Sequence, residues 1–184
     1  MGQIILVRAA STDFDEQDRI VGTLDIPLSI RGQAELAKLA EELKSRPIDV
    51  IYACAGKAAG ESARFLGDKL DVKVKVLEDL TNLDFGLWQG LEVSEVRRKH
   101  PKLFRQWEES PVAICPPNGE MIEQVFERVR KELKPVLKKS HNGVVIVIAP
   151  DPLRRVIRCY LKNTELAKVW ENANGSTWET IDVQ

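Results

Sequence analysis

Short apolar runs alternate along this chain with longer segments in which apolar residues recur at helical spacing. The runs at residues 3–7, 50–53 and 144–149 are rich in branched aliphatic side chains, which is typical of strands that are buried on both faces. Strands of this kind, separated by helices, favour parallel pairing with right-handed crossovers. The sequence therefore predicts an α/β fold, with a mainly parallel sheet and helices on both of its faces.

Three segments have helical periodicity and one has the periodicity of a strand. Apolar residues are three or four positions apart in residues 36–43, 57–70 and 121–137, which predicts three helices that each bury one face. Asn118 is the expected amino-terminal cap of the last helix. Valine alternates with lysine over residues 72–76, which indicates a half-exposed or edge strand.

Residues 78–117 interrupt this alternation. The segment is polar, contains several prolines and includes Trp88 and Trp107. We interpret it as a helical excursion over one end of the sheet, with the tryptophans packing it in place. The chain has 184 residues, of which 43% are apolar, and this is enough for one hydrophobic core. We therefore expect a single domain over residues 1–184.

Charge and hydropathy exclude several classes of protein. The 27 basic and 28 acidic residues give a net charge of −1 without a long block of one sign, so a general nucleic-acid binder is not expected. No apolar run approaches the roughly 18 residues that cross a membrane, and no basic leader is visible, so we expect a cytoplasmic protein. The three cysteines have neither a disulfide pattern nor metal-ligand spacing. We expect neither a metal nor a cofactor.

Ligands of parallel α/β sheets bind beyond the carboxyl ends of the strands, and the segments expected there carry the motifs of one family. In chain order these motifs are Leu6-Val7-Arg8, Gly22 to Ser29 with Gly32-Gln33-Ala34, Glu61-Ser62-Ala63, Asp84 to Gly90, Gly119-Glu120 and the strand at residues 144–149. With them the chain resembles the histidine phosphatase superfamily over nearly its whole length. The resemblance implies a three-layer, phosphoglycerate mutase-like fold.

The family's chemistry, as the resemblance implies it, depends on five groups. A histidine in an Arg-His-Gly motif takes the phosphoryl group, a second histidine and two arginines bind the phosphate, and a glutamate donates a proton. Only one of the five is retained here. The first arginine is retained as Arg8. Ala9 and Pro150 stand in place of the first and second histidines, Ala58 in place of the second arginine, and Asn82 in place of the glutamate.

Neither histidine of the chain is expected to replace the missing ones. His141 precedes the strand at residues 144–149, and a six-residue strand places it about 20 Å from the carboxyl edge of the sheet. His100 follows a basic run at an expected helix end, where a solvated position is favoured. Because several phosphate-binding groups and the nucleophile are missing together, we expect a pseudophosphatase rather than an enzyme. Its role would be binding, scaffolding or regulation, with an unidentified protein or small-molecule partner.

Two alternatives remain open. One is a phosphatase with a rewired nucleophile. The candidates for that nucleophile are Cys54, Asp13, Asp15 and Asp151. The other is a domain that still binds phosphate esters or other anions. The side chains available for this are Arg8, Lys57 and Arg155.

The sequence also predicts a carboxylate partner for Arg8. A guanidinium group at the end of a buried strand is costly unless it is paired. Asp151 is the first candidate, because it directly follows the position of the lost second histidine. Glu120, in the retained Gly-Glu motif, is the second.

Overall fold

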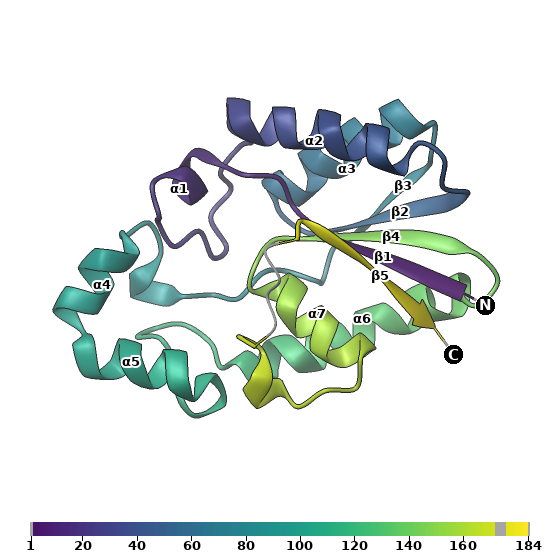
Figure 1. The fold of residues 1–184 in the computed structure, drawn as a ribbon. Coiled ribbons are helices and arrows are strands. Elements are labelled where there is room, and N and C mark those ends of the chain that lie inside the picture. The colour runs from purple at the N-terminus through teal and green to yellow at the C-terminus, as the bar shows by residue number, and fades with distance from the viewer. Residues whose placement is uncertain (1, 172–175, 184) are drawn as a thin grey trace.

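The computed structural model describes residues 2–171 and 176–183 of the chain. Five strands form one sheet in the order β3-β2-β4-β1-β5 (Figure 1). Neighbouring strands run parallel except β5, which pairs antiparallel with β1 at the edge. The strands are β1 (Gly2–Arg8), β2 (Ile48–Cys54), β3 (Val74–Leu77), β4 (Val144–Ala149) and β5 (Trp178–Val183).

Helices cover both faces of this sheet and extend beyond one end of it. Helices α2 and α3 lie on one face and α6 and α7 on the other (Figure 1). The α-helices are α1 (Asp13–Glu16), α2 (Ile30–Leu43), α3 (Lys57–Leu70), α4 (Val93–Lys99), α5 (Pro101–Glu109), α6 (Ile122–Ser140) and α7 (Leu153–Leu161). Three short 3-10 helices are η1 (Gly86–Trp88), η2 (Pro111–Ala113) and η3 (Leu166–Lys168). The predicted three-layer α/β fold with a mainly parallel sheet is confirmed.

The central strands are buried because helices cover both of their faces. Ile4, Ile5, Leu6 and Val7 of β1 have no exposed surface, nor do residues 145–149 of β4. Burial of such aliphatic side chains is the main source of stability in a fold of this kind. The carboxyl ends of β1, β2 and β4 therefore present their loops at one edge of a rigid sheet.

The start of α6 differs from the sequence-based expectation. Met121, not Asn118, is the amino-terminal cap, and its backbone N–H donates to Oε1 of Gln124 at 2.8 Å. Asn118 lies in the preceding turn with a φ of 58°, in the left-handed region that asparagine tolerates better than most residues. The prediction of Asn118 as the cap is wrong, because the turn chemistry at Asn118 competes with capping.

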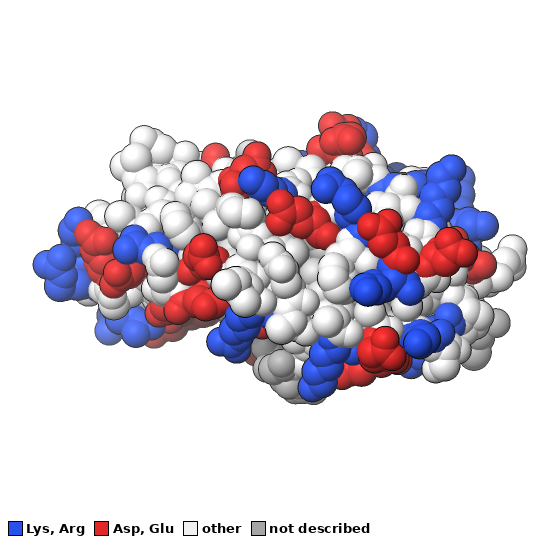
Figure 2. Space-filling view, turned by 90° about the horizontal axis from the view of Figure 1, so that it is seen from above, with Lys and Arg blue, Asp and Glu red and all other residues white. Residues whose placement is uncertain are grey.

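The predicted excursion contains η1, α4, α5 and η2 and lies at the end of the sheet where β1, β2 and β4 finish (Figure 1). Trp88 is completely buried within it, with its ring centroid 5.9 Å from that of Phe104. Positive and negative side chains are interspersed on the face shown in Figure 2, in keeping with the small net charge. Within the described residues, no helix combines the length and apolar character that crossing a membrane requires.

Candidate functional site

A cleft of about 570 Å³ opens beside the carboxyl end of β4. Its walls come from four parts of the chain: residues 15–22 after β1, the excursion, the segment that joins β4 to α7 together with the start of α7, and Trp170 after η3. A smaller hollow of about 210 Å³ shares Val21 and Gly22 with this cleft. A third hollow, of about 160 Å³, lies against α2. Most of the residues that the sequence predicted for one site are distributed over these three spaces, but Ala9 is buried and lines none of them.

The smaller hollow brings together several of the positions that correspond to the family's phosphate pocket. Ala58, Asn82 and Pro150 line it, and Lys57 lies beside them. The backbone N–H of Lys57 donates to Oδ1 of Asp25 at 3.1 Å. Apart from Lys57, these side chains add no positive charge to the hollow. This hollow alone therefore offers little to hold a dianionic phosphate.

Asn82 connects the loops around the hollow to one another through hydrogen bonds. Its Nδ2 atom donates to the carbonyl oxygens of Gly22 and Asp151, both at 3.1 Å, and its Oδ1 atom accepts from the N–H of Leu153 at 3.1 Å. The side chain is only 3% exposed. Both amide hydrogens are occupied, so Asn82 positions loops and is not placed to donate to a ligand.

Arg8 faces the third hollow, away from the other predicted site residues. Its Nη2 atom lies 3.6 Å from Oε2 of Glu35 and donates to Oγ of Ser11 at 3.2 Å. Arg8 is therefore paired with a carboxylate, but the two candidates named for this role are wrong. Glu120 holds Arg128 at 2.6 and 2.8 Å, and Asp151 contacts the arginines of α7. Glu35 reaches Arg8 because α2 packs beside the turn that follows β1.

Asp151 is a carboxylate held between two guanidinium groups. Its Oδ1 atom accepts from Nε of Arg154 at 2.9 Å, and its Oδ2 atom accepts from Nε of Arg155 at 3.3 Å. Arg154 is buried, whereas Asp151 and Arg155 line the cleft. Within the described residues, the two Nη atoms of Arg155 have no hydrogen-bond partner, and the guanidinium lies 5.8 Å from the ring centroid of Trp170. Arg155 thus combines positive charge with unused donors in the cleft.

The other candidate nucleophiles are less well placed. Cys54 is completely buried, and desolvation raises the pKa of its thiol far above the ordinary range. Asp13 is exposed and does not line the cleft. Asp15 does line it, but its Oδ2 atom caps α1 by accepting from the N–H of Thr12 at 2.7 Å and from its hydroxyl at 2.6 Å. Asp151 is the candidate that the geometry favours.

The histidines lie outside all three spaces. His100 is exposed between α4 and α5, and His141 follows α6 at the amino end of β4. Among the residues that the structure describes, no three histidine, cysteine or acidic side chains are grouped as metal ligands would be.

Sequence reasoning missed the aromatic lining of the cleft. Phe85, Phe104, Trp107 and Trp170 all contribute to it, and Trp107 had been expected only to pack the excursion. The density of aromatic residues in an otherwise polar segment is the signal that could have identified this wall. Asp18, at the rim of the cleft, was missed as well.

Comparison with known proteins shows that the chain is similar to proteins named as phosphatases. The family model of the histidine phosphatase superfamily (branch 1) matches residues 4–180. Phosphoserine phosphatase 1 from Hydrogenobacter thermophilus is 33% identical over 170 residues, which cover 92% of this chain and 81% of that protein.

Solved structures with the same fold include two phosphatases. Mycobacterial glucosyl-3-phosphoglycerate phosphatase has a TM-score of 0.81 and 23% identity, over 91% of this chain and 82% of that chain. A histidine-to-alanine mutant of phosphoserine phosphatase from Entamoeba histolytica, in complex with phosphoserine, has a TM-score of 0.83 and 20% identity, over 98% and 90% of the two chains.

These relatives contradict the expectation that the chain is not an enzyme, because they are named as phosphatases. The expectation rested on Ala9, Ala58, Asn82 and Pro150, which stand where the resemblance places the first histidine, the second arginine, the glutamate and the second histidine. Those substitutions remove one nucleophile, two phosphate-binding groups and one proton donor. They leave the fold, the cleft and the Asp151 carboxylate in place, so they do not decide against hydrolysis by another group.

Proposed function

The chain belongs to the histidine phosphatase superfamily, and from this membership we propose that it is a phosphatase that hydrolyses phosphomonoesters without a histidine nucleophile. One observation carries the proposal: the Asp151 carboxylate lines the cleft at the end of β4, between the Nε atoms of Arg154 and Arg155. In this proposal Asp151 is the nucleophile, and Arg155 binds the phosphate with its Nη atoms.

The proposed reaction has two steps. An Asp151 oxygen attacks phosphorus, the bond between phosphorus and the ester oxygen breaks, and the departing oxygen takes a proton from water. The hydroxide so formed cleaves the acyl phosphate, which releases inorganic phosphate and restores the carboxylate. Arg155 stabilises the charge on the phosphoryl oxygens through charge-assisted hydrogen bonds.

The names of the relatives support phosphomonoesters as the class of substrate. Phosphoserine phosphatase and glucosyl-3-phosphoglycerate phosphatase are both named for phosphomonoesters. The Entamoeba histolytica structure contains phosphoserine although one histidine has been replaced by alanine. It supports the view that this fold binds a phosphomonoester without a complete set of histidines.

Phosphate release from p-nitrophenyl phosphate and O-phosphoserine, measured at high enzyme concentration, tests the proposal. For the wild-type protein we expect phosphate release above that of a mock purification. For Asp151→Asn we expect kcat to fall by about 100-fold or more, because the variant lacks the proposed nucleophile. Arg155→Met is expected to raise KM. Asp68→Asn, an exposed change on α3, is the control and is expected to behave as the wild type.

Two outcomes would overturn the proposal. One is the absence of turnover in the wild-type protein, and the other is unchanged turnover in Asp151→Asn. Hydroxylamine trapping adds an independent readout, because an acyl phosphate on Asp151 is converted to a hydroxamate that mass spectrometry assigns to this residue. Circular dichroism of each variant separates loss of activity from loss of the fold.

A further inference from the structure

Aromatic rings form one wall of the large cleft. The ring centroids of Phe85 and Trp107 are 5.7 Å apart, and those of Trp107 and Trp170 are 5.4 Å apart. The indole N–H of Trp170 donates to the backbone oxygen of Trp107 at 3.3 Å, which fixes one ring against the other. The faces of aromatic rings carry negative charge density and attract organic cations.

The charged side chains of the cleft have a negative balance. Four carboxylates and two arginines line it. They are Asp15, Asp18, Glu108 and Asp151, with Arg19 and Arg155. Arg19 already uses all three of its nitrogens, on Gln17 at 2.9 Å, the carbonyl oxygen of Gly90 at 2.7 Å and Glu92 at 3.2 Å. Arg155 is therefore the arginine placed to bind the phosphate.

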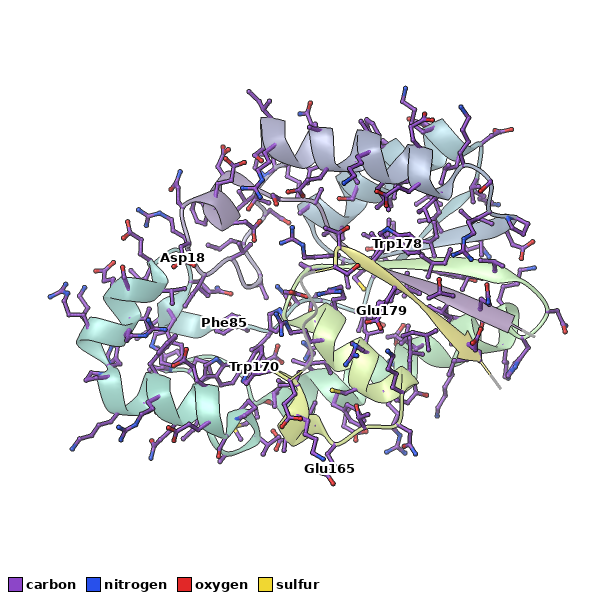
Figure 3. The ribbon with its side chains drawn as sticks, viewed as in Figure 1. Asp18, Phe85, Glu165, Trp170, Trp178 and Glu179 are labelled. Atoms are coloured by element: carbon purple, nitrogen blue, oxygen red, sulfur yellow. The ribbon has the colours of Figure 1, made fainter. Side chains whose placement is uncertain are left out.

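Asp18 is held in a fixed place at the rim of this cleft. Its N–H donates to the carbonyl oxygen of Asp15 at 3.2 Å, and its own carbonyl oxygen accepts from Val93 at 2.9 Å. Its φ of 52° is in the left-handed region, where aspartate is tolerated better than most residues. Within the described part of the chain, its carboxylate has no hydrogen bond or ion pair. Figure 3 shows Asp18, Phe85 and Trp170 on the side of the molecule where the excursion meets the sheet.

We propose that the preferred substrate is the phosphate ester of an alcohol that carries a positively charged amine. This inference rests on the proposed function, because it names the substrate class for the same cleft. The phosphate binds at Arg155, whose guanidinium lies 5.8 Å from the centroid of the Trp170 ring. The ammonium group lies between Asp18 and the small exposed parts of Phe85 and Trp107, which are 8% and 5% exposed, beside Trp170. Two attractions then act on one cation: a carboxylate, and rings that favour primary or quaternary ammonium groups.

The same charges disfavour esters of alcohols that carry a carboxylate and no amine. A carboxylate on the substrate would compete with the phosphate for Arg155, or would face Asp15, Asp18 and Glu108, of which Glu108 is paired with Arg97 at 3.2 Å. Like charges placed together cost affinity and so contribute to specificity. An ester with an uncharged alcohol would bind through its phosphate alone.

Four esters of similar size test this inference: O-phosphoethanolamine, phosphocholine, ethyl phosphate and 3-phosphoglycerate. Calorimetric Kd and the kcat/KM for phosphate release are measured for each. We expect the two cationic esters to bind with a Kd about tenfold lower than that of ethyl phosphate and to have a kcat/KM about tenfold higher, and 3-phosphoglycerate to be the poorest of the four. Asp18→Asn should remove most of the cationic preference, measured as the ratio of kcat/KM for phosphocholine to kcat/KM for ethyl phosphate. Asp68→Asn is the matched control.

Trp170→Leu gives a second variant that addresses the aromatic wall. We expect it to weaken phosphocholine more than ethyl phosphate. Equal affinity for all four esters, or an unchanged preference in both variants, would overturn the inference while the proposed function stands. If p-nitrophenyl phosphate is also neither bound nor hydrolysed, it is the proposed function that fails, and the inference fails with it.

Discussion

Arg8 and Glu35 form a partly buried pair, with 3.6 Å between Nη2 and Oε2, and both contact Ser11. Ser11 donates its N–H to Oε2 of Glu35 at 3.1 Å and its hydroxyl to Oε1 at 2.9 Å. The arginine that the motif retains is thus tied to α2 through the turn that follows β1. In this arrangement Arg8 stabilises the fold and does not face the cleft.

Glu35→Gln is predicted to lower the free energy of unfolding by about 1–2 kcal/mol. The change weakens the ion pair and replaces one carboxylate oxygen, which leaves a partly buried donor poorly satisfied. Glu41→Gln on the same helix removes only an exposed contact with Lys44 and should cost less than about 0.5 kcal/mol. Urea unfolding of both variants checks this, and equal losses would contradict it.

The parts of the fold with strong periodicity could be predicted from sequence. The apolar run at residues 144–149 is β4, and the helical pattern at residues 57–70 is α3, because burial leaves a regular trace in the sequence. Strand β5 was not predicted. It pairs antiparallel at the sheet edge and has only Ile181 buried, so its alternation is weak.

The candidate site was harder to predict because its contacts join segments that are distant in sequence. Nothing in the local pattern around Arg8 points to Glu35, which helix packing brings to it. The contacts of Asp151 with Arg154 and Arg155 did have a local signal. Spacings of three and four residues at the start of a helix bring these side chains together. The aromatic wall has no such periodicity, since its residues come from separate elements.

Asn82→Ala is predicted to lower the free energy of unfolding by about 2–3 kcal/mol. Three hydrogen bonds are lost, and a buried N–H and two carbonyl oxygens are left without this partner. Asn142→Ala, an exposed change in the turn before β4, should remain within about 0.5 kcal/mol of the wild type. Urea unfolding measures the free energy of unfolding of both variants. An unchanged unfolding midpoint for Asn82→Ala would show that the Asn82 side chain does not stabilise the contacts between these loops.

Trp88 tests how the excursion is held together. The side chain is completely buried, and its Nε1 atom has no hydrogen-bond partner in the described structure. Trp88→Ala should therefore cost about 3–5 kcal/mol through the cavity it leaves, while Trp88→Phe should cost clearly less, because no hydrogen bond is lost. Leu87→Ala, at a 63% exposed neighbour, is the control and should be nearly neutral. Similar losses for both Trp88 variants would contradict this account.

The three cysteines are predicted to differ in their reactivity toward a thiol reagent. Cys115 is exposed, whereas Cys54 and Cys159 are buried, so one thiol should react in the native protein and three in guanidinium chloride. Desolvation, and then the negative charges of Glu120 and Asp84, raise the pKa of Cys115. A raised pKa keeps the thiol neutral near neutral pH, so its labelling should be slow there and should accelerate about tenfold per pH unit up to the pKa. Cys115→Ser should abolish the native reaction. Labelling of a second thiol in the folded protein, or a rate that levels off below the ordinary thiol pKa, would contradict the prediction.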